Sequence, residues 1–222
     1  MISRSKTPSG LRFTAKGHSY RYRGRVVPSV TQVLEAMGLS TIHLIPDKHR
    51  VFALERGRLV HLACELYDQG RLKWATLDPQ LAPYVRAWAK FSEVMDFVPY
   101  DIERRVVIGG GRCAGTLDVR GSAKHYPRLL IDRKCGGTEP PGTPLQTAAY
   151  QLGLGPDGVD HVRATVLLKP TGEPKFLPAD PTTNARDQGW FLAILTTYEV
   201  QRLLLPKQHT DDGPVFRRTM EG

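Results

Sequence analysis

Three charged residues near the middle of the chain end two segments that have the composition of β-strands. Asp118 closes a Gly-x-x-Asp segment that begins at Gly115, and Asp132 and Lys134 follow an apolar run. Because side chains alternate across a strand, Asp132 and Lys134 share one face while Arg133 points to the other. If the two strands pair as a hairpin, Asp118 comes opposite the neighbourhood of Asp132. The spacing therefore predicts two carboxylates and one lysine at one place.

These residue types suit a divalent cation. Two neighbouring carboxylates repel each other unless a cation neutralises them, and hard oxygen ligands favour Mg²⁺ or Mn²⁺. Such an ion polarises a phosphate and lowers the pKa of its bound water, which Lys134 could orient or deprotonate. The alternative is that Asp132 and Lys134 form a surface ion pair and Asp118 is a turn residue. The apolar run before Asp132 favours the metal site, since charges are rarely placed there without a partner.

Two helical segments add further polar pairs. His61 and Glu65 are four residues apart in a segment before the strands, and Gln146 and Tyr150 have the same spacing in a segment after them. Each pair lies on one face of its helix. Neither pair is specific alone, because a helical histidine is more often a solvated or core residue than a ligand.

In this order the four segments resemble the RecB-like branch of the PD-(D/E)XK nucleases, which includes lambda-type phage exonucleases, CRISPR-associated exonucleases and the mitochondrial genome-maintenance exonuclease. The resemblance runs from about Gly57 to Tyr150. In that family a G-x-x-x-H-x-x-x-E helix precedes the sheet, G-x-x-D ends the second strand, D/E-x-K ends the third, and a Q-x-x-x-Y helix follows. Here the acid before x-Lys is Asp rather than the commoner Glu.

The resemblance implies a role for each matching residue. It makes Asp118, Asp132 and Lys134 the catalytic centre. It makes His61, Asp118, Asp132 and the backbone carbonyl of Arg133 the metal ligands, with Mg²⁺ as the cofactor and Mn²⁺ as its substitute. Gln146 and Tyr150 resemble the motif that lies beside the site and contacts DNA or braces the lysine. Glu65 and Glu103 are further candidates to bind substrate or to support the ligands. Three cysteines without a C-x-x-C pair argue against the iron-sulfur cluster of some relatives.

The hydrophobic periodicity predicts an α/β fold, expected by resemblance to be the PD-(D/E)XK core, with a mixed central sheet flanked by helices. The 222 residues are expected to form one nuclease domain, with an accessory N-terminal hairpin and helix (1–45), a catalytic core (47–205) and a basic tail (206–222). Predicted helices end near Met37 after a cap at Ser29 or Thr31, and cover 47–67 with a possible break at Gly57, 81–95, 143–154 and 184–205. Predicted strands form a hairpin over 18–27, an antiparallel meander over 101–108, 114–120 and 128–134, and further strands over 161–168 and 175–177.

The charge of the chain favours a polyanionic partner. Lys and Arg number 31 against 22 Asp and Glu, a formal charge of +9. Arginines crowd the predicted meander, where they could neutralise DNA phosphates: Arg104, Arg105, Arg112, Arg120 and Arg133. No apolar run is long enough to span a bilayer, and no secretory signal is visible, so we expect a cytoplasmic protein without a membrane partner.

The expected function is metal-dependent hydrolysis of DNA. By resemblance we expect an exonuclease that acts on free ends in phage-type recombination or DNA processing, leaving 5′-phosphate and 3′-hydroxyl ends. A single-strand annealing protein or a recombinase is a further expected partner, and a phage-encoded protein would work in the bacterial host cell. The alternatives are a structure-selective or nicking endonuclease and a catalytically silent DNA-binding module of a recombination complex.

Overall fold

The computed structural model describes residues 7–40 and 45–205. Its helices are α1 (Val30–Ala36), α2 (Asp47–Asp68), α3 (Ala82–Val94), α4 (Thr143–Leu154) and α5 (Asn184–Leu204), with short 3₁₀ turns at Trp74–Thr76, Gly155–Gly158 and Pro181–Thr183. A three-stranded sheet contains β1 (Leu11–Thr14), β2 (Ser19–Tyr22) and β3 (Arg25–Val27). A five-stranded sheet contains β4 (Val98–Ile108), β5 (Cys113–Ala123), β6 (Tyr126–Cys135), β7 (Val162–Leu168) and β8 (Pro174–Pro178).

The five-stranded sheet is mixed and has its strands in sequence order. β4, β5 and β6 form the antiparallel meander that the sequence predicts. β6 and β7 are parallel, and α4 makes the crossover that a parallel pair requires. β8 then pairs antiparallel with β7. The expectation of an α/β fold with a mixed central sheet flanked by helices is thus confirmed.

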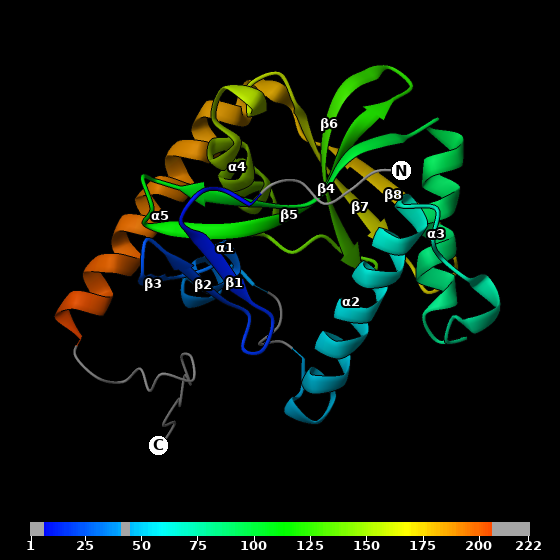
Figure 1. Cartoon of the computed structure of the whole chain (residues 1–222), viewed down its shortest axis with the longest axis horizontal. Coiled ribbons are helices and arrows are strands. Elements are labelled where there is room, and N and C mark those ends of the chain that lie inside the picture. Colours follow the sequence, from blue (N-terminus) through cyan, green and yellow to red (C-terminus); the bar gives the residue numbers. More distant parts are fainter. Residues whose placement is uncertain (1–6, 41–44, 206–222) are drawn as a thin grey trace.

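Helices cover both faces of this sheet (Figure 1). On one face α2 and α3 pack on the sheet through a cluster that contains Val60, Trp88, Phe91, Ile102, Val119, Leu129 and Ile131. On the other face α1, α4 and α5 pack through a cluster that contains Val33, Val106, Leu117, Leu130, Tyr150, Phe191 and Leu195. Leu129 and Ile131 lie on one side of β6 and Leu130 on the other, as strand alternation requires.

The N-terminal segment forms three strands rather than the predicted hairpin. β2 and β3 make that hairpin around Gly24, but β1 adds to it through pairs such as Phe13 with Tyr20. The four residues of β1 are too few for a clear periodic signal. Ser29, and not Thr31, caps α1: its hydroxyl accepts from the backbone N–H of Gln32, and the Gln32 side chain accepts from the Ser29 N–H.

The predicted break in the helix over 47–67 is wrong, because α2 runs without interruption through Gly57. A single glycine weakens a helix by only about 1 kcal/mol, which packing of the C-terminal half of α2 against the sheet offsets. The expected basic tail, 206–222, lies outside the described residues. All three cysteines are free. Among the helices of the described ranges, none has the length and apolar character to cross a membrane.

Candidate metal centre

The candidate site lies where β4 and β5 both change the face that they present to the helices. Ile102 and Val119 pair across the two strands and pack under α2 and α3, whereas Leu117, paired with Arg104, packs under α4. Regular alternation would keep Leu117 and Val119 on the same face. The change therefore falls between these pairs, at Glu103 on β4 and Asp118 on β5. The two long strands bend in Figure 1 accordingly.

The backbone at this bend is strained. Glu103 has a φ of 51°, a left-handed conformation that is uncommon for residues other than glycine, asparagine and aspartate. The bend turns the Glu103 side chain towards Asp118. Strain of this kind is kept where the surrounding structure overrides the local preference, and functional sites are frequent among such places.

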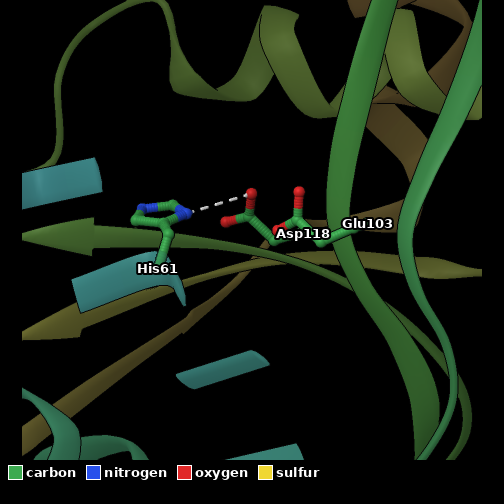
Figure 2. Close-up of side chains that lie close together, drawn as sticks. All are labelled: His61, Glu103 and Asp118. Atoms are coloured by element: carbon green, nitrogen blue, oxygen red, sulfur yellow. Dashed lines mark ion pairs between the residues drawn. The ribbon is translucent and has the colours of Figure 1, made fainter. Parts of the chain in front are cut away.

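Glu103, Asp118 and His61 of α2 converge. One ligand atom from each lies within 4.8 Å of the others. Figure 2 shows the two carboxylates side by side, with the His61 ring aimed at Asp118, and the His61 Nδ1 and Asp118 Oδ1 atoms are 3.3 Å apart. The Glu103 and His61 side chains are 23% and 30% exposed, so that solvent can reach the cluster.

Asp118 lies at the centre of this cluster and also contacts β6. The register of β5 and β6 pairs Val119 with Ile131, and its continuation places Asp118 opposite Asp132, as predicted. There the strands separate, and the Asp118 Oδ2 atom accepts a hydrogen bond of 2.7 Å from the Arg133 backbone N–H. Burial alone would raise the pKa of Asp118, but His61 and this hydrogen bond outweigh it and lower the pKa. Asp118 is therefore ionised.

The pKa values of its neighbours respond to that charge. Burial lowers the pKa of His61, but the Asp118 carboxylate outweighs it and the net shift is upward. Burial and the Asp118 charge together raise the pKa of Glu103 to about 7. Glu103 is therefore partly protonated near neutral pH. A cation bound between the two carboxylates would remove this repulsion.

The predicted pair of Asp132 and Lys134 forms on the other face of β6, beneath α4. Lys134 Nζ is 2.9 Å from Asp132 Oδ2, and it donates a hydrogen bond of 2.9 Å to Gln146 Oε1. The Gln146 amide in turn donates to the Tyr150 hydroxyl at 2.9 Å. Burial lowers the pKa of Lys134, but the Asp132 carboxylate outweighs it and raises the pKa. The lysine is thus a fixed cation, held from both sides.

Gly115 gives the Tyr150 ring its place. A Cβ atom built on Gly115 would lie 2.7 Å from Tyr150 Cε1, closer than such atoms can approach. The glycine of the Gly-x-x-Asp segment thus makes room for the tyrosine that holds Gln146, which holds Lys134. This contact gives a physical reason for a glycine three residues before Asp118.

Arg133 points to the opposite face of its strand, as predicted, and is fully buried there. Its guanidinium donates to Asp68 Oδ2 at 2.8 Å and lies over the Trp88 ring, and Trp88 Nε1 donates to Asp68 Oδ1 at 2.6 Å. The guanidinium also comes within 3.9 Å of Glu103 and of Asp118. It is therefore a permanent positive charge behind the acidic cluster.

The structure brings most of the expected site residues together, in two groups. His61, Asp118 and Glu103 form the cluster, so that Glu103 lies among the potential ligands rather than behind them. Asp132 does not join that group and pairs with Lys134 instead. Glu65 is buried on α2, where it accepts a hydrogen bond from Gln69. Its charge also raises the pKa of Glu103, but less than burial and the Asp118 charge do. No ligand role follows for Glu65 from these contacts.

Sequence reasoning missed Asp68 and Trp88, which anchor Arg133. Asp68 follows His61 by seven residues and Glu65 by three, the spacing that keeps residues on one face of a helix. That periodicity was a usable signal for Asp68. Trp88 offered none, because a tryptophan in an amphipathic helix is an ordinary core residue.

The donor atoms of the cluster fit a divalent cation of the Mg²⁺ or Mn²⁺ type. Two carboxylates provide hard oxygen ligands, and an imidazole nitrogen makes Mn²⁺ acceptable as well. The backbone carbonyl of Arg133, the other expected ligand, belongs to the residue whose N–H binds Asp118. Asp132 and Lys134 lie next to these ligands, since they flank Arg133, whose backbone N–H donates to Asp118.

The arginines expected to bind DNA from the meander are mostly engaged inside the protein. Arg120 forms an ion pair with Asp101, Arg112 with Glu199 at 2.5 Å and Arg133 with Asp68. Arg104 lies within 3.7 Å of both Asp101 and Asp157, and Arg105 donates to Thr7 and covers the Phe13 ring. These contacts give the five arginines structural roles.

Comparison with known proteins adds no family to this picture: the chain matches no protein-family model and none of the curated proteins.

Proposed function

We propose that this protein is a divalent-metal-dependent DNA nuclease with a PD-(D/E)XK core. The observation that carries the proposal is the convergence of His61, Glu103 and Asp118 next to the Asp132–Lys134 pair, at the bend of a mixed sheet. The chain order supports the same core: a helix with the histidine, an antiparallel meander with both aspartates, a crossover helix and a parallel strand.

The residues would divide the work as follows. His61, Glu103 and Asp118 would hold the cation, together with the Arg133 backbone carbonyl, and Asp132 would hold Lys134 beside it. A bound Mg²⁺ supplies charge to polarise the phosphodiester and lowers the pKa of a bound water. Lys134, a cation fixed by Asp132 and Gln146, would orient the attacking water and stabilise the charge that develops on the phosphate. Arg133 would keep the cluster in place from behind.

The substrate side of the proposal is hydrolysis from free DNA ends, which leaves 5′-phosphate and 3′-hydroxyl products. The net charge of +9 supports a nucleic acid as the partner. Preference for ends over internal sites is drawn from the resemblance to lambda-type exonucleases, and the experiment below tests it directly.

The test incubates the full chain with Mg²⁺, Mn²⁺ or EDTA on linear duplex DNA labelled at either end and on closed circular DNA. Lys134→Ala is run beside Lys175→Ala, a matched loss of an exposed lysine on β8. We expect metal-dependent loss of linear DNA, unchanged in Lys175→Ala and reduced about 10²- to 10⁴-fold in Lys134→Ala. Cutting of circles would instead identify an endonuclease.

A separate measurement keeps metal binding distinct from catalysis. Calorimetric titration of Mn²⁺ should give one or two sites in the wild type and a weakened site in Asp118→Asn and Glu103→Gln. DNA binding without hydrolysis, together with no Mn²⁺ binding, would show that the protein is a DNA-binding module and that the proposed activity is wrong.

A further inference from the structure

The positive charge of the chain is concentrated at its N-terminal end. Residues 1–34 contain seven lysines and arginines and no aspartate or glutamate, and the first acidic residue is Glu35. Residues 35–222 contain 24 basic and 22 acidic residues, which nearly cancel. Five of the seven, Arg12, Lys16, Arg21, Arg23 and Arg25, lie between Leu11 and Val27, the segment that forms the three-stranded sheet.

The two faces of this sheet have opposite character. Its inner face packs on Ala114 of β5 through Leu11, Tyr20 and Val27, which are all buried. The outer face carries Arg12 and Arg21, which lie directly opposite each other on β1 and β2 and are exposed. Like charges directly opposite on neighbouring strands are destabilising. Strand alternation requires only that the residues at these two exposed positions be polar, so folding does not explain why both are arginine.

The outer arginines have no acidic partner within the part of the chain that the structure describes. Among residues 7–40 and 45–205, no carboxylate lies within ion-pair distance of Arg12, Arg21 or Arg23. The same three arginines, with Gly10 and Gly24, line a hollow of about 440 Å³. The arginines of the large sheet are paired or packed inside the protein. The arginines of the small sheet are instead free of carboxylate partners among the described residues and can contact an external anion.

The sheet that carries this surface contacts the strand that carries Asp118. The Tyr20 hydroxyl is 2.8 Å from Thr116 Oγ1, and Thr116 is two residues before Asp118 on β5. Two residues of strand span roughly 7 Å. The small sheet is therefore fixed beside β5 (Figure 1), and a polyanion lying on its outer face could extend towards Asp118.

We propose that the outer face of β1 and β2, with Arg12, Arg21 and Arg23, binds the phosphate backbone of duplex DNA without reading its sequence. The guanidinium group favours phosphate because its fork of donors fits two oxygens. Aromatic groups that would stack on bases face inward: Phe13 and Tyr20 pack with the core side of the sheet. The choice of DNA rests on the proposed function, whereas the phosphate chemistry rests on the sheet alone.

A membrane surface is the competing partner of similar charge. Interfacial binding to anionic lipids also needs apolar side chains that enter the headgroup region. Val26, which pairs with Arg21, is the one large apolar residue on the outer face of these three strands. The composition of this face therefore favours a nucleic-acid backbone over a bilayer.

The test measures fluorescence anisotropy of a labelled duplex of arbitrary sequence with the full chain, in EDTA so that no hydrolysis occurs, from 50 to 300 mM salt. The variant is Arg12→Gln/Arg21→Gln, and the control is Arg86→Gln/Lys175→Gln, which removes two exposed charges from α3 and β8. We expect roughly tenfold weaker binding of the variant at 50 mM salt, and a slope of log K against log salt that is smaller by about 2. The control should keep the wild-type slope.

Other results would overturn the proposal. An unchanged slope in the Arg12/Arg21 variant, or an equal loss in the control, would mean that the outer face does not hold the duplex. Flotation with phosphatidylserine vesicles forms a second arm: vesicle binding that depends on these arginines, without an effect on DNA, would assign the face to a membrane. The binding assay in EDTA does not depend on hydrolysis, so binding and cutting are tested separately. If the duplex binds through Arg12 and Arg21 but is never cut in Mg²⁺ or Mn²⁺, the binding face stands and the proposed nuclease function is wrong.

Discussion

The candidate metal centre and the N-terminal sheet treat their charges in opposite ways. In the candidate metal centre, His61, Asp118, Asp132 and Lys134 each lie within 4.0 Å of an opposite charge, and Arg133 faces three carboxylates. On the outer face of the sheet, Arg12 and Arg21 face each other. Burial explains the difference, because an unpaired charge is costly in the interior and inexpensive in water.

The difference indicates how each region can work. Paired and buried charges are fixed in position, which suits a small cation and a reacting water. Unpaired and exposed charges remain available to an extended polyanion that brings its own opposite charge. Changes in the first region should therefore alter stability and the proposed catalysis, whereas changes in the second should alter the proposed DNA binding alone.

The largest effect is expected at Arg133. Arg133→Met removes the guanidinium and leaves Asp68 buried without its partner, which typically costs about 3–5 kcal/mol. We expect a lower midpoint of urea unfolding and little soluble protein at elevated temperature. The neighbouring carboxylates also lose a positive charge, so the pKa of Glu103 should rise further.

A second variant checks the cause of that loss. Asp68→Asn/Arg133→Met keeps an acceptor for Trp88 Nε1 but removes the buried negative charge. It should recover much of the stability of the single variant. If the double variant is less stable than Arg133→Met, packing over Trp88 rather than charge pairing is the main role of Arg133.

Next in size is the pH dependence at Glu103. Its pKa is raised to about 7 in the folded protein, so between about pH 4.5 and 7 the folded form keeps a proton that the unfolded form has lost. Stability of the metal-free protein should therefore fall as pH rises through this window, by up to about 3 kcal/mol. The pKa of His61 is also raised in the folded protein, so this group likewise makes stability fall as pH rises.

Glu103→Gln should flatten this dependence and raise the melting temperature of the metal-free protein at pH 8. Glu93→Gln, which changes an exposed carboxylate on α3, is the matched control. In the wild type, Mn²⁺ should stabilise the protein more at pH 8 than at pH 6, because the ion competes with the proton on Glu103. An unchanged profile in Glu103→Gln would show that this carboxylate is not crowded by Asp118.

The sequence predicted the framework of the site because alternation and helical spacing are local properties. Residue periods place Asp132 and Lys134 on one side of β6 and His61 and Gln146 on helices. The predicted hairpin of β5 and β6 brings Asp118 towards Asp132. The layer order followed as well, since its elements are long and strongly patterned. These features do not depend on contacts between segments far apart in sequence.

The rest depended on tertiary contacts. The bend that turns Glu103 towards Asp118 breaks strand alternation in both strands, and no residue type near Glu103 predicts it. The arginines of the meander were indistinguishable in sequence from those of β1 and β2. Only their distant partners, such as Glu199 for Arg112, separate the two sets.

A smaller effect is expected at Gly115, at the far end of the chain of contacts to Lys134. Gly115→Ala places a Cβ atom 2.7 Å from the Tyr150 ring and 3.2 Å from Val30 Cγ2. Overpacking of this kind costs about 1–3 kcal/mol. If Tyr150 moves, Gln146 releases Lys134, so the proposed nuclease activity should fall even in folded protein, beyond what the loss of stability explains. Gly137→Ala, where a Cβ would meet nothing within 4 Å, is the control.

The smallest effect is expected on the outer face of the N-terminal sheet. Arg12→Thr replaces one of two opposed cations with a residue that favours strands, and removal of a cross-strand repulsion stabilises by about 0.2–1 kcal/mol. We expect an equal or slightly higher midpoint of urea unfolding, in contrast to the loss at Arg133. A drop of more than about 1 kcal/mol would mean that Arg12 is held by a group inside the protein. The distinction between paired interior charges and available outer charges would then fail, and with it the reason to place DNA on this face.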